Sequence, residues 1–418
     1  MPEMIENIIA PDRVLLAAVD TGSYDVGVSL DELEELVRTA GGEVAARVVQ
    51  KRPSYDSASC IGAGRLEEMA ELCAQLGVNR IVFDCELTAT QIRNIEKVCD
   101  VFTIDRTMLI LDIFAQRATT HEGRLQVEIA QNKYRLPRLA GKGADLSRLG
   151  GGIGTRGPGE TKLETDKRHI RSRIEKLSAE LEEIAKHRDM LRKRRKKDNV
   201  LVAAIVGYTN VGKSTLLNTL TQAGVLAENK LFATLETTSR AIELPDGRSV
   251  TLVDTVGLIR RLPHQLVEAF KSTLEEAANA DVIIHVCDAS AEDCAQQVQV
   301  TNELLNELGC AGIPVVTVLN KCDKVPYIDE LDISKQENTV KMSAKNGTGI
   351  AELLVAVQKA LPQSCIRCRL LVPFDKAGLL STVRAEGRIF SEEYTADGIL
   401  VDALVDVKVY HLAEGFKV

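Results

Sequence analysis

The residues best suited to chemistry form a glycine-rich stretch near the middle of the chain. In order, they are Gly207, Tyr208, Thr209, Asn210, Val211, Gly212, Lys213, Ser214 and Thr215. The stretch fits the pattern GxxxxGK[ST], directly follows the apolar run LVAAIV and opens the helical pattern STLLNTLTQ, which indicates a phosphate-binding loop. We expect Lys213 to place its charge on the β- and γ-phosphates and Ser214 to be a ligand for Mg²⁺. The alternative is a plain glycine turn before a helix, which the preceding strand and the following motifs disfavour.

A loop and a strand end farther along the chain suit the rest of a magnesium–triphosphate group. The loop holds Phe232, Ala233, Thr234, Leu235 and Glu236, and the strand SVTLVD leads into Asp254, Thr255, Val256 and Gly257. Thr234 can reach both Mg²⁺ and the γ-phosphate, Asp254 can hold Mg²⁺ through water, and the Gly257 N–H can sense the γ-phosphate. A single threonine in a loop has no meaning by itself, and only the order of the motifs supports it. The predicted metal ligands are Ser214 and Thr234.

Two further strand ends can recognise a guanine base. They hold Asn320, Lys321, Cys322 and Asp323, followed later by Ser343, Ala344 and Lys345. The Asp323 carboxylate can accept hydrogen bonds from the guanine N1–H and N2 amino groups, and adenine offers neither, so this residue selects GTP over ATP. The Ala344 N–H can meet the guanine O6. Five motifs in this order, at or just beyond the carboxyl ends of strands, predict a Mg²⁺-dependent GTP hydrolase.

The predicted catalytic residues are Lys213, Thr234 and Gly257, but the position after Gly257 is unusual. Ras-like GTPases have a glutamine there that orients the attacking water, whereas this chain has Leu258. Because an aliphatic side chain cannot orient water, either hydrolysis is slow or another group completes the site. Arg260 and Arg261 are the nearest candidates, and the alternative for both is a solvated surface position.

The elements before these motifs form two different patterns. Strand-like runs at 14–20, 43–50, 80–85 and 101–105 alternate with helical runs, which predicts a small, mostly parallel sheet covered by helices. Ser29 is expected to cap the first helix, with Glu32 completing a capping box. From Arg106 the pattern is helical up to Pro137, and a second helical run covers about 161–197.

A glycine-rich loop separates the two helical runs, so the segment predicts a hairpin with a flexible tip. Eight glycines lie between Gly141 and Gly159. Residues 133–198 contain 20 Lys and Arg against 10 Asp and Glu, a net charge of +10, although the whole chain carries −8. A single basic segment on an acidic protein indicates one surface for an acidic partner, with nucleic acid the first candidate. A solvated helix face is the alternative.

Length and composition set the remaining limits. A chain of 418 residues is too long for one core, and we expect domains at 1–105, 106–198, 199–362 and a small α+β domain at 363–418. The predicted fold class is α/β. No run approaches about 18 apolar residues, no secretory signal is visible, and ten dispersed cysteines fit a reducing compartment. We expect a cytoplasmic monomer that neither binds DNA nor inserts stably into a membrane.

Several stretches of the chain resemble the HflX family of ribosome-associated GTPases. They are LTATQIRNIEK (Leu87–Lys97), IDRTMLILDIFAQRA (Ile104–Ala118), LSRLGGGIGTRGPGETKLETD (Leu146–Asp166), GYTNVGKSTLLN (Gly207–Asn218), LFATLETTSR (Leu231–Arg240), DTVGLIRRLPHQLVEAFKSTLEE (Asp254–Glu276) and NKCD (Asn320–Asp323). Together they reach over about three quarters of the chain, and the glycine-rich stretch is specific to the family. One departure is LETTSR, which stands where the family usually has an Asp-Pro-Thr-Thr pattern.

The resemblance implies a site, a partner and a role. The residues that it assigns to nucleotide or Mg²⁺ are Lys213, Ser214, Thr234, Asp254, Asn320 and Asp323. It implies binding to the large ribosomal subunit and its rRNA, with dissociation or rescue of ribosomes under stress. A hydrophobic residue at Leu258 is normal for the family. The alternative function is a G-protein switch that acts on a protein effector without a ribosomal role, and such a switch would not require the basic segment.

Overall fold

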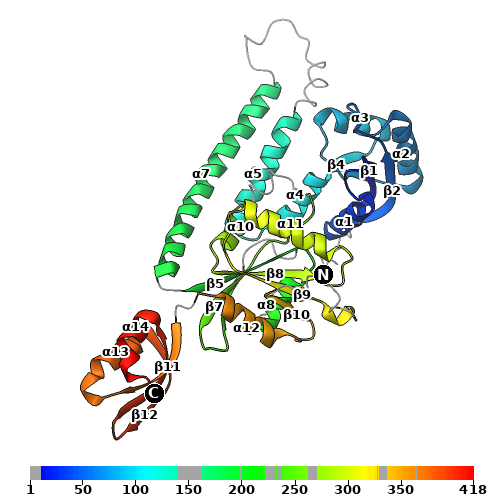
Figure 1. Cartoon of the computed structure of the whole chain (residues 1–418). Coiled ribbons are helices and arrows are strands. Elements are labelled where there is room, and N and C mark those ends of the chain that lie inside the picture. The colour runs from blue at the N-terminus through cyan, green and yellow to red at the C-terminus, as the bar shows by residue number, and fades with distance from the viewer. Residues whose placement is uncertain are drawn as a thin grey trace, which may run out of the picture. The chain divides into compact units, whose positions relative to one another are not determined.

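The computed structural model describes residues 11–139, 162–197, 200–221, 231–232, 238–261, 271–326, 328, 337–362 and 365–418 (Figure 1). The chain divides into two compact units. The first unit comprises Met1–Arg192, Glu228–Glu236 and Val256–Thr273, and the second comprises Lys193–Ala227, Thr237–Thr255 and Leu274–Val418. Two short segments from the middle of the chain therefore belong with the N-terminal part.

The first unit contains a parallel sheet with the strand order β2-β1-β3-β4. Its strands are β1 (Arg13–Asp20), β2 (Glu43–Lys51), β3 (Arg80–Phe83) and β4 (Phe102–Asp105), and its connecting helices are α1 (Val26–Thr39), α2 (Ala63–Leu76) and α3 (Ala89–Cys99). Residues 14–19 of β1 are all buried, as expected for a parallel strand with both faces covered. The predicted parallel sheet is confirmed.

Helix α1 begins one turn earlier than the sequence predicts. Its N-cap is Asp25, whose carboxylate accepts a hydrogen bond from the Val28 backbone N–H at 3.1 Å. Ser29 lies inside the helix, and its buried hydroxyl donates to Asp84. The predicted Ser29 cap is therefore wrong, because Val26 extends the buried face of the helix by a turn and Asp25 is an equally good capping residue.

The first long helical run is two helices, α4 (Arg106–Arg117) and α5 (His121–Arg138). Thr120 ends the continuity because its hydroxyl accepts a hydrogen bond from the Gly123 backbone N–H at 3.0 Å and so caps α5. Pro137 does not terminate α5 but lies in its last turn.

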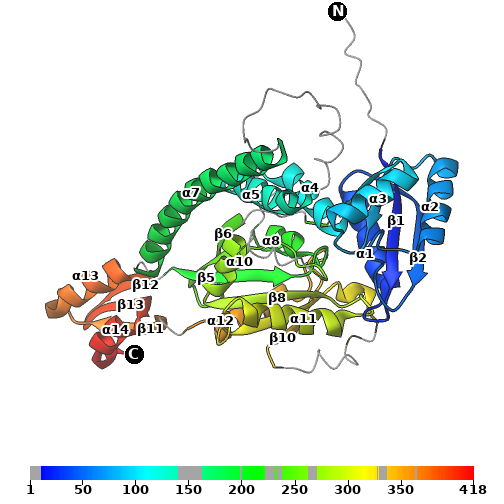
Figure 2. The same cartoon turned by 90° about the horizontal axis from the view of Figure 1, so that it is seen from above.

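Helix α7 (Lys162–Lys197) lies beside α5, as both views show (Figure 1 and Figure 2). Leu177 on α7 is buried with Leu125 and Ile129 on α5. An ion pair between Arg173 and Glu128, 2.8 Å from nitrogen to oxygen, links the same two helices. The hairpin is confirmed, and its predicted glycine tip, Gly141 to Gly159, lies outside the described residues.

The second unit contains a six-stranded sheet with the order β10-β9-β8-β5-β7-β6. Its strands are β5 (Leu201–Gly207), β6 (Thr238–Glu243), β7 (Ser249–Asp254), β8 (Val282–Asp288), β9 (Val315–Asn320) and β10 (Thr339–Lys341), and its helices are α8 (Lys213–Thr221), α10 (Lys271–Ala278), α11 (Cys294–Glu307) and α12 (Ile350–Ala360). All neighbours are parallel except β6, which runs antiparallel to β7. The predicted motifs therefore follow the carboxyl ends of adjacent strands.

The C-terminal part of this unit has a three-stranded antiparallel sheet in the order β11-β13-β12. The elements are β11 (Cys365–Val372), α13 (Ala377–Glu386), β12 (Gly387–Thr395), β13 (Gly398–Asp406) and α14 (Val407–Ala413). These strands and helices form the small α+β unit that the sequence predicts. The α/β fold class is confirmed, and the four domain boundaries stay a prediction.

Candidate functional site

The glycine-rich loop follows β5 directly, and two of its glycines are sterically required. Gly207 has a φ of +158°, and a Cβ there would lie 2.2 Å from the Val286 carbonyl oxygen. Gly212 has a φ of +99°, and its Cβ would lie 2.4 Å from Asn320 Nδ2. A side chain at either position would force the loop away from neighbouring strand ends. The GxxxxG spacing thus keeps the backbone close against β8 and β9.

Lys213 is the charged group at the centre of this loop. Its side chain is buried, and Nζ donates hydrogen bonds to the carbonyl oxygens of Gly207 at 3.0 Å and Tyr208 at 2.7 Å. Burial lowers the pKa of Lys213 to about 8, although the charge of Asp254 acts in the opposite direction. A desolvated ammonium held by neutral carbonyls is well prepared to bind an anion.

Ser214 and Asp254 present oxygen atoms beside Lys213. The Ser214 hydroxyl donates to Asp254 Oδ2 at 3.1 Å, and Asp254 is fully buried at the end of β7. A hydroxyl and a carboxylate are the hard oxygen donors that Mg²⁺ prefers. The residues present therefore fit a magnesium ion, with Ser214 and Asp254 on the same side of the loop.

Asn320 and Lys321 fasten the loop to neighbouring segments. Asn320 Nδ2 donates to the Val211 carbonyl at 2.7 Å, and its Oδ1 accepts from the Ala344 N–H at 2.9 Å. Lys321 Nζ contacts the Asn210 carbonyl at 2.9 Å and Asp288 Oδ2 at 2.6 Å. Each of the two residues therefore holds three strand ends together. The sequence assigns the Ala344 N–H to guanine, but here this group donates to Asn320.

Asp323 remains available at the surface beyond these contacts. It is exposed, and a hydrogen bond from the Ser343 hydroxyl is the main cause that lowers its pKa. The carboxylate is therefore ionised at neutral pH and can only accept hydrogen bonds. This is the form that the recognition of a donor pair on a base requires.

His285 is a buried residue near the loop for which the sequence gives no role. It lies in the middle of β8, and burial, followed by the charge of Lys213, lowers its pKa to about 4. The imidazole is therefore neutral at pH 7 and adds no second positive charge near Lys213. The only sequence signal is a histidine inside an otherwise apolar strand.

Several other predicted site residues lie in segments that belong with the first unit or are not described. Ala233, Thr234, Leu235 and Glu236 lie outside the described residues, so the first predicted magnesium loop stays a prediction. Phe232 is buried, and its ring lies edge-on against Phe114 with 4.6 Å between the centroids. Val256 and Gly257 begin the second of the two segments that group with the N-terminal part.

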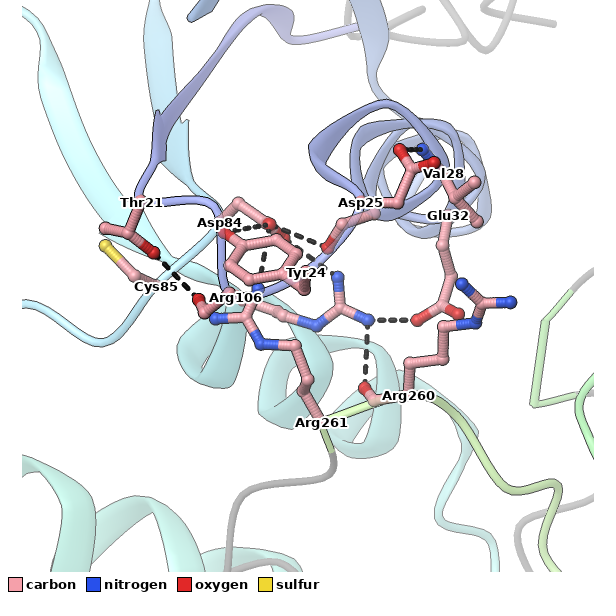
Figure 3. A network of polar contacts seen from close by, with 12 residues as sticks. Thr21, Tyr24, Asp25, Val28, Glu32, Asp84, Cys85, Arg106, Arg260 and Arg261 are labelled. Atoms are coloured by element: carbon pink, nitrogen blue, oxygen red, sulfur yellow. Dashed lines mark hydrogen bonds and ion pairs between the residues drawn. The ribbon is translucent and has the colours of Figure 1, made fainter. Parts of the chain in front are cut away.

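The two arginines after Gly257 are not both solvated. Arg261 forms an ion pair with Asp84 at 3.1 Å, and its guanidinium lies over the Tyr24 ring at 4.0 Å (Figure 3). Arg261 is therefore exposed and at the same time held by partners in the first unit, so a freely solvated position, the alternative for this residue, does not describe it. The sequence did not single out Asp84, although it follows β3 directly in the same way that the nucleotide motifs follow their strands.

Three family models match consecutive parts of the chain. They are described as GTP-binding GTPase N-terminal (residues 28–115), GTP-binding GTPase Middle Region (residues 117–195) and 50S ribosome-binding GTPase (residues 202–321). A protein named GTPase HflX from Lacrimispora saccharolytica is 48% identical over 98% of this chain and 97% of its own length. This chain belongs to the HflX family of GTPases. It is also similar to the HflX proteins of Caldanaerobacter subterraneus subsp. tengcongensis, with 46% identity over 97% of this chain and 94% of that protein, and of Escherichia coli K12, with 42% identity over 88% and 87%.

Family membership fixes the reaction as the hydrolysis of GTP on a P-loop fold. The predicted enzyme class, a GTP hydrolase, is confirmed. The resemblance to the HflX family is confirmed as well. In this chain, the match to the GTPase model follows the matches to the N-terminal and middle-region models. None of the helices in the described ranges combines the length and hydrophobicity needed to cross a membrane.

Proposed function

We propose that this HflX-family chain is a GTPase that binds the large ribosomal subunit and uses GTP hydrolysis to limit the lifetime of the complex. The observation that supports the nucleotide part best is the buried Lys213, held in a glycine-fixed loop beside the Ser214–Asp254 pair. The ribosomal part is supported by the match to a model described as a 50S ribosome-binding GTPase and by the basic helix α7.

Each group of the site has a proposed role in binding GTP. Lys213 leaves its two carbonyl partners and binds the β- and γ-phosphates, where its charge stabilises the negative charge that shifts to the leaving GDP. Ser214 and Thr234 would hold Mg²⁺ directly, and Asp254 would hold it through water. A bound magnesium ion would neutralise phosphate charge. The Gly257 N–H binds the γ-phosphate, and Asp323 selects guanine.

Leu258 leaves the site without a side chain that can orient water. We infer that the free protein hydrolyses GTP slowly and that the ribosomal particle supplies or orders the missing group. The rate of GTP hydrolysis tests this directly when it is measured for the free protein, for the protein with purified large subunits and, as a control, for the protein with small subunits. Equal rates in all three samples would contradict the inference.

Helix α7 is the proposed RNA-binding element. Its 36 residues contain 14 Lys and Arg and seven Asp and Glu, a net charge of +7, and six consecutive cations end it at Arg192–Lys197. Cations in the last turn are also favoured by the helix dipole. Contacts from such residues to phosphates provide affinity without reading the sequence. The glycine tip, with Arg148 and Arg156, is proposed to become ordered on the rRNA.

The proposed consequence of this binding is dissociation or rescue of ribosomes under stress. Co-sedimentation with separated subunits, in GDP and in a non-hydrolysable GTP analogue, tests the partner. The proposal expects binding to the large subunit that is stronger with the GTP analogue. Binding to neither subunit would favour the alternative, a switch that acts on a protein effector.

A further inference from the structure

Two cysteines lie in contact at the carboxyl edge of the N-terminal sheet. Cys60 lies in the loop between β2 and α2, and Cys85 is the second residue after β3, next to Asp84 (Figure 3). Their Sγ atoms are 3.3 Å apart and share a hydrogen bond, and both thiols are free. A disulfide requires a separation of about 2 Å, so a small rotation of either side chain would bring the sulfurs to bonding distance. The pair is therefore placed for a reaction that the nucleotide chemistry does not use.

Cys60 is held against Cys85 by a strained turn of the backbone. Its φ is +67°, in the left-handed region where a residue with a side chain is uncommon. The Ile61 N–H donates to the Ser59 carbonyl oxygen at 2.7 Å, so Cys60 is the central residue of a tight three-residue turn, which is a rare and strained form. Strained residues persist only where their surroundings fix them, and they are concentrated at functional sites. The strain at Cys60 therefore indicates a function for this position.

Contacts to helix α3 hold the loop in this conformation. Asp56 and Cys60 exchange two backbone hydrogen bonds, with nitrogen–oxygen distances of 2.8 and 3.0 Å. Gln91 Nε2 donates to the Asp56 carbonyl oxygen at 2.8 Å, and Asn94 Nδ2 donates to the Ala58 carbonyl oxygen at 2.9 Å. Because these contacts fix the loop before any reaction, little further entropy is lost when the two sulfurs bond.

The surroundings of the two thiols differ in charge. The hydrogen bond from Cys85 lowers the pKa of Cys60, although burial opposes this shift. The same hydrogen bond, together with burial, raises the pKa of Cys85. The charge of Arg52 also lowers the pKa of Cys60, against that of Asp56, whereas the charge of Asp84 raises the pKa of Cys85. Cys60 is therefore the thiol that ionises more readily, and the thiolate is the form that reacts.

Burial restricts which oxidants reach the pair. Cys60 is 1% exposed and Cys85 is 8% exposed, so the folded protein excludes large thiol reagents. The loop lies at the surface, where Tyr55 is 43% exposed, and small local openings can admit hydrogen peroxide, which is only slightly larger than water. Burial also keeps foreign thiols away, so an oxidised Cys60 meets Cys85 first.

We propose that Cys60 and Cys85 form a modification site, where a hydroperoxide converts the two thiols into a reversible disulfide. The Cys60 thiolate attacks one oxygen of hydrogen peroxide, the O–O bond breaks and hydroxide leaves, which gives a sulfenic acid on Cys60. The sulfur of Cys85 then attacks the sulfur of Cys60, the S–O bond breaks, and the leaving hydroxyl takes the thiol proton of Cys85 as water. The first hydroxide accepts the proton that Cys60 lost on ionisation. In total, the thiols are oxidised by two electrons and one peroxide is reduced to two molecules of water.

Closure of the disulfide would join two loops at the same edge of the sheet. The cysteines are 25 positions apart, so the cross-link restricts the unfolded chain and stabilises the folded domain. In a reducing compartment, which the sequence predicts, such a disulfide is transient and suits the sensing of oxidants. A thiol reductant breaks it by exchange and restores both thiols. The proposal does not depend on the proposed ribosomal function.

Mass spectrometry of the full-length protein tests the site. The protein is treated with a slight excess of hydrogen peroxide, its free thiols are alkylated in denaturant, and it is digested without reduction. The expected product is a peptide pair that joins Cys60 to Cys85, is lighter than its parts by two hydrogen atoms and is lost on treatment with dithiothreitol. Absence of this linkage, or an equal yield of linkages between other cysteines, would overturn the proposal.

Three variants separate the roles of the two thiols. Cys85→Ala should leave the sulfenic acid on Cys60 without a resolving thiol, so that dimedone traps it there once the protein is unfolded. Cys60→Ala should leave Cys85 unmodified at peroxide concentrations that oxidise the wild type. Cys73→Ala, which removes a buried cysteine from the same core, is the matched control and should form the disulfide at the wild-type rate. Sulfenic acid on Cys85 in Cys60→Ala would overturn the assignment of Cys60 as the reacting thiol.

Arg52→Gln tests the electrostatic part of the proposal. Arg52 pairs with Asp56 at 3.4 Å and lowers the pKa of Cys60, so its removal should raise that pKa. The rate of disulfide formation should fall several-fold at pH 7, and its pH profile should move to higher pH. Lys97→Gln, at an exposed cation on α3, should change neither. An unmoved profile in Arg52→Gln would overturn Cys60 as the thiol that ionises.

Discussion

Replacing Lys213 by methionine should stabilise the nucleotide-free protein at pH 7 while it abolishes GTP binding. Burial lowers the pKa of Lys213 from 10.5 to about 8. A shift of this size corresponds to about 3 kcal/mol of unfavourable free energy for keeping the buried lysine charged at pH 7. Methionine is similar in shape and uncharged, so it removes this penalty.

The lost hydrogen bonds oppose the gain. Lys213 Nζ donates to two carbonyl oxygens, and leaving each without this donor costs about 1 kcal/mol. The net gain for Lys213→Met at pH 7 is therefore about 1 kcal/mol. Between pH 8 and 10.5 the unfolded wild type binds more protons than the folded one, so wild-type stability rises with pH. Above pH 10.5 the penalty is gone, and the variant should be about 2 kcal/mol less stable than wild type.

Urea unfolding of both proteins at several pH values between 7 and 10.5 measures this difference, because titrations common to both proteins cancel. Lys359→Met, at an exposed position on α12, is the control, and its difference from wild type should not depend on pH. The reasoning is refuted if Lys213→Met is less stable than wild type at pH 7 and the gap stays constant as the pH rises.

Four other results are expected. Asp323→Asn should weaken GTP binding and favour xanthine nucleotides in competition assays, and unchanged GTP affinity would exclude Asp323 as the base-recognition residue. Neutralising Arg192, Lys193, Arg194 and Arg195 should lower ribosome affinity and reduce the slope of log K against log salt by roughly 0.7–0.9 per lost phosphate contact. The control variant has glutamine at four exposed cations, Arg38, Lys51, Arg93 and Lys97. An equal slope in both variants would contradict α7 as the RNA contact. Replacing Gly141–Gly159 by a short Gly-Ser turn should preserve GTP binding and abolish ribosome-stimulated hydrolysis, whereas a wild-type rate would make the loop a passive connector. Leu177→Ala should destabilise the hairpin by about 2–5 kcal/mol, measured by hydrogen exchange in α5 and α7, because Leu177 is 2% exposed between the two helices.

The sequence predicts most strands and helices because their signals are local. The alternation of strands and helices up to residue 105 and the motifs after β5, β7 and β9 depend on spacing along the chain. The start of α1 was misplaced because Asp25 and Ser29 are both good caps and local signals do not distinguish them. The sequence analysis also misses the break before Thr120, although residues 119–124 contain no large apolar side chain and Thr120 is a good capping residue.

The contacts of Arg261 could not be predicted because they join distant parts of the chain. Arg261 and Asp84 are 177 positions apart, and nothing near either residue indicates the other. Lys213 shows the opposite case, because its motif fixed its place while its lowered pKa depends on three-dimensional burial. A pattern of residue types identifies the nucleotide loop, but it does not reveal which surface holds the segments beside it.

The length of α7 makes it a lever. At 1.5 Å per residue, its 36 residues span about 54 Å, so a rotation of 5° at one end moves the other end by about 5 Å. A single helix of this length would therefore not hold its far end in a well-defined position. The packing of Leu177 against Leu125 and Ile129 pairs α7 with a second helix and stiffens the lever over the stretch that they share. The position of the far end of α7 should thus depend on a few leucine and isoleucine side chains between the two helices, and these are not proposed to contact nucleotide or RNA.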